Sequence, residues 1–431
     1  MSVGATKIDK AWEQLFDKHN ILSRVSTDGV FRISSTQINE VHEARLMAKF
    51  DQSTLLPDAF RSNNLSILPV TRGEYIIGPF QTHEKIIYRP VKPKQVEIPQ
   101  LETLDSKNLY SEASALFFAY NSGIINDIMG SDKVQFTVNG RMGSGAFSFS
   151  IDNSLNPQIP VSVDVKNSQV EIDAGFESPD AFVICEAKNQ ASNELLIRQL
   201  YYPYRLWSNK ISKPVIPVFL AFSNDIFHVF TYEFTDKQNY NSIRLKDYKE
   251  YTFADEEISF QDIVDLWRSI SDIREPDVTF PQADSFPRIL DLLSVLHEEE
   301  LTRTEVTMKY EFDSRQTNYY VSACEYLGLI ERFSTDDNER GYRLATDVRT
   351  TMSLPYKQKH LTLMRKVLEC PVFYRAFEIL MKNNEVPDKR TICQIMKDTD
   401  FSKPINDTTI GRRASTVSGW LNWMIQLSVA E

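Results

Sequence analysis

The 431-residue chain is poor in the residues that mark specialised protein classes, with 4 Cys, 14 Gly and 19 Pro. So little glycine and proline excludes collagen-like and low-complexity proteins, and a hydrophobic fraction of 42% excludes a wholly disordered chain. No apolar run approaches the roughly 18 residues that a membrane helix requires. The opening MSVGATKIDKAWEQLF lacks the basic-then-apolar layout of a signal peptide, so we expect a soluble, cytoplasmic, globular protein.

The few cysteines and histidines are scattered along the chain. Cys185, Cys324, Cys370 and Cys393 form no CxxC pair, which is typical of reduced cytosolic thiols rather than of disulfides or a zinc site. The six histidines form no HxH or HxxxH pair. We therefore expect no metal centre that depends on histidine.

Charge is also unevenly distributed. The net charge of −11 argues against a protein that coats nucleic acid without specificity. Residues 1–284 carry a net charge of −10, whereas residues 285–431 carry only −1. This asymmetry is a first sign that the C-terminal third has a role different from that of the acidic body.

A chain of this length should hold two to four domains at roughly 150 residues each. Residues 1–99 read as an α+β block that ends in an extended, Pro- and Lys-rich linker, VKPKQVEIPQ. In this block we expect helices at 8–21 and 37–50 and strands at 30–34, 75–80 and 85–91.

Residues 100–280 alternate helices with strands. We expect a helix at 108–129, a hairpin of strands 134–140 and 145–151, two more strands, a helix, and a final pair of strands at 214–223 and 226–234. This order predicts a mixed sheet flanked by helices. The run VIPVFLAF predicts a strand covered on both faces.

Residues 285–431 are mostly helical and contain two similar units. In 285–350, three helices followed by the strand GYRLAT have the order of a winged helix. In 351–431, three further helices resemble a helix-turn-helix. Both units place a polar, basic entry before a third helix with an apolar back face.

The most informative stretch is VEIDAGFESPDAFVICEAKNQ. Asp173 ends one β-rich run, and Glu186 and Lys188 end the next, on the same face of a strand. If the runs are neighbouring strands, two carboxylates and an ammonium converge, which suits a divalent ion and an activated water. A plain surface ion pair is the alternative. Two further acid-x-lysine triplets, Asp164-Val165-Lys166 and Asp247-Tyr248-Lys249, occur at polar, loop-like sites.

The predicted elements are, in order, a helix with Glu112, a hairpin, Asp173, Glu186-x-Lys188 and a following helix. In the order of these elements, the chain resembles the core of the PD-(D/E)xK nuclease superfamily. The resemblance covers roughly residues 105–235, and within the superfamily the chain looks like a type II restriction endonuclease. The phrases EARLMAKFD, ILPVTRGEY and TIGRRASTVSGWLNWM also resemble such enzymes. The implied fold class is α/β, with a nuclease-like mixed sheet, an N-terminal α+β domain for DNA recognition or dimerisation, and a winged-helix-like C-terminal region.

The resemblance also implies a cofactor and roles for individual residues. Mg²⁺ would be held by Asp173, Glu186 and the main chain of Ala187, and Lys188 would assist the attacking water. Glu112 would reach the metal through water, unless it is a solvated helix residue. Gln199 resembles a glutamine that some related nucleases use beside the active site, and a plain helix-surface residue is the alternative.

One position departs from the family pattern. The nominal Pro-Asp dipeptide is absent, because Ile172 precedes Asp173. A literal Pro179-Asp180 leaves only five residues before Glu186, too few for a strand and a turn. Asp173 is therefore the preferred ligand, and Asp180 is the second choice.

Candidate DNA contacts lie in three places. In the glycine-rich segment NGRMGSGAF, Arg141 could pair with phosphate, although a tight hairpin explains the glycines equally well. Arginine reads guanine or binds phosphate, and hydroxyls and amides also contact DNA, so the entries to the two third helices are further candidates. These residues are Arg315, Gln316, Thr317, Asn318, Arg412, Arg413, Ser415 and Thr416.

These features together predict a Mg²⁺-dependent, site-specific endonuclease that cuts unmethylated double-stranded DNA. By analogy with the family, it would act as a homodimer and be paired with a protective DNA methyltransferase. Two alternatives remain: a methylation-dependent or repair nuclease of the same fold, and a DNA-binding regulator without activity. No phosphate-loop, dinucleotide-binding or nucleophile-elbow signature is present.

Overall fold

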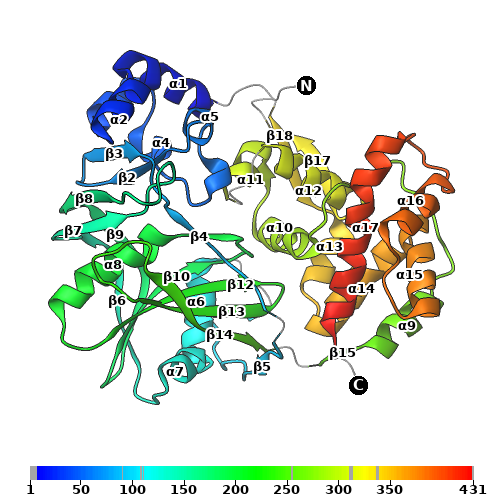
Figure 1. Cartoon of the computed structure of the whole chain (residues 1–431). Coiled ribbons are helices and arrows are strands. Elements are labelled where there is room, and N and C mark those ends of the chain that lie inside the picture. The colour runs from blue at the N-terminus through cyan, green and yellow to red at the C-terminus, as the bar shows by residue number, and fades with distance from the viewer. Residues whose placement is uncertain are drawn as a thin grey trace.

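The computed structural model describes residues 7–89, 91–106, 109, 111–253, 256–309, 314–335 and 339–429. An N-terminal α+β part, a central mixed sheet and a largely helical C-terminal part follow one another along the chain and stand side by side (Figure 1). The mixed α/β class is therefore confirmed. In the described part of the chain, no helix is long and apolar enough to cross a membrane.

The N-terminal part packs short helices on a small antiparallel sheet. Its strands run in the order β1-β3-β2. The bounds are α1 Lys7–His19, α2 Ile21–Asp28, β1 Phe31–Ser34, α3 Ser35–Asn39, α4 Ala44–Met47, α5 Asp58–Arg61, β2 Ser66–Pro69 and β3 Glu74–Gly78. The helix expected at 37–50 is divided, because the Asn39 side chain accepts the N–H of Ala44 and α4 begins anew there.

The central part is a seven-stranded sheet in the order β5-β14-β13-β12-β10-β9-β6. Only two of its neighbouring pairs, β10 with β12 and β14 with β5, are parallel. The strands are β5 Lys94–Gln95, β6 Gln135–Gly143, β9 Gln169–Glu177, β10 Phe182–Lys188, β12 Val215–Ser223, β13 Ile226–Phe234 and β14 Ile243–Thr252.

Helices cover both faces of this sheet, as the apolar run of β12 predicts. One face, with Val218 and Leu220, packs on α6 (Glu112–Asn121) and α7 (Ile124–Met129). The other face, with Phe219, packs on α8 (Ile197–Lys210). The helix expected at 108–129 is interrupted between α6 and α7, where Gly123 takes a left-handed φ of 81°.

The predicted hairpin at 134–151 is wrong. β6 pairs with β9, and β7 (Ala146–Ile151) leaves the large sheet to pair with β8 (Val161–Lys166). Phe147 and Phe149 on β7 pack against Tyr201 and Tyr202 of α8. The free energy gained by burying these rings on α8 outweighs the advantage of the short connection, which would favour pairing of β6 with β7 as a hairpin.

The segment expected to be a linker belongs partly to the central part. Its Lys94–Gln95 forms β5 on the edge of the large sheet, beside β14. Just before it, β4 (His83–Lys85) pairs with β11 (Glu194–Leu196). The chain therefore joins the central part well before Pro99, the boundary that its composition indicates.

The C-terminal part begins with the element order of a winged helix. The elements are α10 Phe286–Glu298, β16 Leu301–Thr302, α11 Arg303–Lys309, α12 Ser314–Tyr326, β17 Ile330–Ser334 and β18 Arg340–Leu344. The strands form one sheet in the order β16-β18-β17.

Further helices share a single hydrophobic core with this unit, so the two predicted units form one body. They are α9 Phe260–Arg268, α13 Thr346–Met352, α14 Tyr356–Leu368, α15 Pro371–Asn383, α16 Lys389–Lys397 and α17 Asp407–Leu427. Trp420 and Trp423 of α17 pack in this core, and the Trp420 indole donates to the carbonyl of Ala283 at 2.7 Å.

A cluster of polar side chains, the interface cluster, joins the central sheet to the C-terminal part. Its members are Ser223, Asn224 and Asp225 at the β12–β13 turn, Asp291 on α10, and Lys359 and His360 on α14. Lys359 pairs with Asp225 at 2.5 Å. The Asp291 carboxylate accepts from the Ser223 hydroxyl at 3.0 Å, and His360 Nε2 lies 3.1 Å from the Asn224 amide oxygen.

Candidate active site

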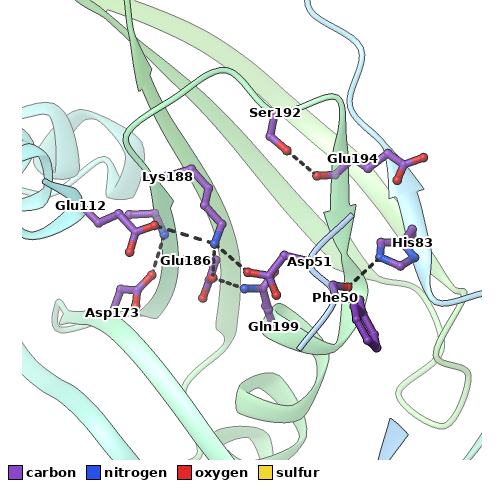
Figure 2. Close-up of polar contacts among 11 residues, drawn as sticks. Phe50, Asp51, His83, Glu112, Asp173, Glu186, Lys188, Ser192, Glu194 and Gln199 are labelled. Carbon is purple, nitrogen blue, oxygen red and sulfur yellow. Dashed lines mark hydrogen bonds and ion pairs between the residues drawn. The ribbon is translucent and has the colours of Figure 1, made fainter. Parts of the chain in front are cut away.

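Asp173 and Glu186 lie on neighbouring strands of the central sheet, as their spacing predicts (Figure 2). β9 and β10 are antiparallel with Cys185 opposite Ala174, so the next pair along the register is Glu186 and Asp173. Asp173 lies in the middle of β9 rather than at its end, and its Oδ2 accepts the main-chain N–H of Ala187 at 2.8 Å.

Lys188 ends β10 and turns its ammonium toward acidic groups on its own strand, on α6 and in the N-terminal part (Figure 2). Its Nζ lies 3.6 Å from Glu186 Oε1, 3.8 Å from Glu112 Oε1 and 3.1 Å from Asp51 Oδ2. The Lys188 side chain is only 12% exposed, so a plain surface ion pair does not describe this contact.

Two helices complete the group that we call the catalytic cluster, which consists of Asp51, Glu112, Asp173, Glu186, Lys188 and Gln199. Glu112 opens α6, directly after the N-cap Ser111, and is thereby held at the cluster. Gln199 lies in the first turn of α8, and its Nε2 donates to Glu186 Oε1. The structure thus brings both helix residues to the strand residues that the sequence singled out.

The carboxyl groups of the cluster resist ionisation. Burial raises the pKa of Glu186 well above its usual value of 4.5, and the Asp173 carboxylate raises it further. Burial also raises the pKa of Asp173 and of Glu112. A bound cation would favour the ionised form of all three groups.

The donor atoms fit Mg²⁺. Among the described residues, no group of three or more His, Cys, Asp and Glu side chains forms a ready metal cage. A Mg²⁺ site needs none, because one or two carboxylates usually hold the ion together with waters or substrate phosphates. Asp173 and Glu186 supply two such carboxylates. The cluster's four carboxylates also outnumber its cations, even when the exposed Lys49 near Glu112 is counted.

The second-choice ligand and the other acid-x-lysine triplets lie elsewhere. Asp180 is exposed in the turn between β9 and β10, at the opposite end of β10 from Glu186. The Asp164 and Asp247 triplets were expected in loops but lie on strands β8 and β14. Asp164 accepts from the Ser148 hydroxyl at 2.6 Å, and Asp247 lies 4.0 Å from Lys249. The catalytic cluster contains neither triplet.

Sequence reasoning missed Asp51. It follows Phe50 in the stretch EARLMAKFD, which we singled out only for its resemblance to restriction enzymes. No local pattern links Asp51 to Lys188, because the two are 137 residues apart and belong to different parts of the fold.

Arg141 lies on β6 and not in a hairpin loop. Its Nε lies 3.1 Å from Glu171 on the neighbouring strand, and 58% of its side chain is exposed. A phosphate would compete with Glu171 for this arginine. Close packing explains why residue 143 is a glycine, since a Cβ at Gly143 would lie 2.2 Å from the Asn167 side chain.

The candidate residues on the C-terminal helices divide by burial. Asn318, Arg412 and Ser415 are exposed, and Gln316 and Arg413 are half-buried. Thr317 and Thr416 are fully buried, so these two pack against other helices and present no surface to DNA. The side chain of Arg315 lies outside the described residues.

Comparison with known proteins found matches only to family models described as domains of unknown function. DUF6996 matches residues 9–77, DUF6997 matches 78–252 and DUF7226 matches 288–429. No curated protein and no solved structure matches significantly. The three matched segments correspond to the N-terminal, central and C-terminal parts of the fold.

Proposed function

We propose that this protein is a Mg²⁺-dependent, site-specific endonuclease that cuts double-stranded DNA in the manner of a type II restriction enzyme. The observation that carries the proposal is the convergence of Asp173, Glu186 and Lys188 on two paired strands, with Glu112 and Gln199 beside them. This is the set of groups, in the chain order, on which the resemblance to PD-(D/E)xK nucleases rests.

Each group has a task that follows from its position. When bound by Asp173 and Glu186, Mg²⁺ would supply positive charge for the phosphate oxygens in the transition state. Gln199 fixes the orientation of the Glu186 carboxylate by donating to Oε1. Lys188, 3.6 Å from Glu186, is placed to orient the attacking water with its ammonium.

The C-terminal part supports DNA as the substrate. It has the element order of a winged helix, a motif that places a helix in the major groove. Arg412 and Ser415, near the start of α17, and Asn318 on α12 are exposed candidates for phosphate or base contacts. Cutting both strands requires two active sites or two sequential events, so we propose a homodimer, and protection of host DNA would require a cognate methyltransferase.

The experiment is incubation of the purified protein with unmethylated phage DNA, in Mg²⁺ and in EDTA, followed by electrophoresis. We expect discrete fragments in Mg²⁺ alone. Lys188→Ala should abolish cleavage but retain DNA binding. Lys166→Ala is the matched control, because Lys166 ends an acid-x-lysine triplet on the exposed face of β8.

Other outcomes would redirect the proposal. A smear would indicate a non-specific or repair nuclease, and cutting of methylated DNA alone would indicate a methylation-dependent enzyme. Full activity in Lys188→Ala would contradict the assigned site. DNA binding without cutting of either substrate would favour a regulator.

A further inference from the structure

The N-terminal part of the chain inserts a carboxylate into the catalytic cluster (Figure 2). Asp51 lies between α4 and a short 3-10 helix, Ser53–Leu55. Its Oδ2 accepts from Lys188 Nζ at 3.1 Å, closer than the 3.6 Å and 3.8 Å that separate Nζ from Glu186 and Glu112. The Asp51 side chain is only 4% exposed, so the pair is shielded from solvent.

The main chain on both sides of Asp51 is anchored to the central part. His83 Nε2, on β4, donates to the carbonyl of Phe50 at 3.3 Å. On the other side, Glu194 on β11 accepts from the N–H and the hydroxyl of Ser53 at 2.8 Å and 2.9 Å. Because β4 and β11 are paired, both anchors belong to one small sheet, and Asp51 is fixed between them.

We propose that Asp51 is a positioning residue, which holds the Lys188 ammonium beside Glu186 at the point of attack. A lysine side chain has four flexible carbons, and a charge-assisted hydrogen bond to a fixed carboxylate selects one of its orientations. The active site is therefore composite, with its metal-binding carboxylates in the central part and its lysine orienter in the N-terminal part. The chemical role of Lys188 in this inference rests on the proposed function.

A purely structural role for Asp51 predicts a different result. If the Asp51–Lys188 pair only joined two parts of the chain, its loss would lower stability and the amount of folded protein. The turnover of the remaining folded molecules would be unchanged. A positioning role predicts that kcat falls while KM and DNA affinity stay constant.

The first test is cleavage kinetics of Asp51→Asn, which keeps the shape of the side chain and removes its charge. We expect kcat to fall about 10–100-fold, as for other residues that orient catalytic groups, with KM unchanged. Asp51→Glu restores the charge and should recover part of the loss. Asp58→Asn is the control, because Asp58 is an exposed carboxylate of the same part of the chain, and its kcat should equal that of the wild type.

The second test needs no cleavage. We expect the shifts in melting temperature of Asp51→Asn and Lys188→Met to be non-additive in the double variant, since each single change already removes the shared contact. Additive shifts, or an unchanged kcat in Asp51→Asn, would overturn the inference. If the wild type cuts no DNA, the proposed function fails, and the melting shifts alone decide whether Asp51 holds Lys188.

Discussion

The catalytic cluster and the interface cluster both bury charged side chains, but they balance them differently. In the interface cluster, Asp225 has its own ammonium in Lys359, and Asp291 accepts from Ser223 and from the N–H of Ala191. In the catalytic cluster, four carboxylates share Lys188 and the more distant Lys49. The interface cluster gives each of its carboxylates an ammonium or hydrogen-bond donors, whereas the acidic excess of the catalytic cluster carries a cost in stability that a bound cation or protonation removes.

Removing one of the excess carboxylates should have the largest effect. Glu186→Gln keeps the contact with Gln199 but removes a proposed metal ligand, so under the proposed function cleavage should fall by more than about 100-fold, beyond the 10–100-fold typical of outer-sphere partners. The same variant should melt at a higher temperature than the wild type at neutral pH, because glutamine does not titrate, whereas ionisation of Glu186 is easier in the unfolded chain than in the fold and favours unfolding.

The pH dependence of this gain follows from the raised pKa of Glu186. In the wild type, the stability from this group is full below pH 4.5 and is lost as the pH rises through its folded pKa. The gain of Glu186→Gln should therefore be near zero at pH 4 and grow toward pH 8. Glu171→Gln, an exposed change on the neighbouring strand β9, should show no gain, and a destabilised Glu186→Gln would break the comparison.

A smaller effect, on stability alone, is expected when the Lys359–Asp225 ion pair of the interface cluster is broken. Lys359→Met leaves Asp225 buried without its ammonium, which should lower the free energy of unfolding of the C-terminal part by about 3 kcal/mol. Urea unfolding followed by tryptophan fluorescence measures this, since Trp420 and Trp423 lie in that core.

The control for this change lies on the same helix. Lys366 pairs with the largely exposed Asp347, so Lys366→Met should cost less than about 1 kcal/mol. Equal losses in the two variants would mean that burial does not distinguish the interface cluster from the surface.

The smallest effect concerns Asp291, whose pKa burial raises to about 7. Its contribution to stability is full below pH 3.8 and is lost as the pH rises through about 7. Between pH 5 and 8, the wild type should therefore lose about 2–3 kcal/mol relative to Asp291→Asn, equivalent to about 5–10 °C in melting temperature. Parallel pH curves for the two proteins would show that Asp291 does not titrate in this range.

The sequence predicted the parts of the site that depend on local pattern. Strand alternation placed Glu186 and Lys188 on one face, and the succession of apolar runs made the strand of Asp173 their neighbour. Gln199 and Glu112 followed from the resemblance, and the structure places both at the cluster. The mixed sheet and the winged-helix order were predictable because each depends on the order of elements along the chain.

What could not be predicted depends on contacts distant in sequence. Asp51 meets Lys188 only because β4 and β11 fix the main chain on both sides of Asp51. No periodicity in the sequence predicts the pairing of these two strands. The expected hairpin failed because β7 buries its phenylalanines on α8, which a local turn pattern does not reveal. Thr317 and Thr416 were candidate DNA contacts because they lie at the polar entries of two helices. The orientation of a helix is set by its neighbours, however, and both side chains face inward.

The C-terminal part starts and finishes on one short parallel pair, β15 (Ile258–Ser259) with β19 (Ser428–Val429). The first and last strands of this part are therefore adjacent in space. Segments with neighbouring ends can be inserted or exchanged without rethreading the host chain. Under the proposed function, exchange of this part would change the DNA preference and leave the cutting site unchanged, provided that the replacement reproduces the partners of Asp225 and Ser223.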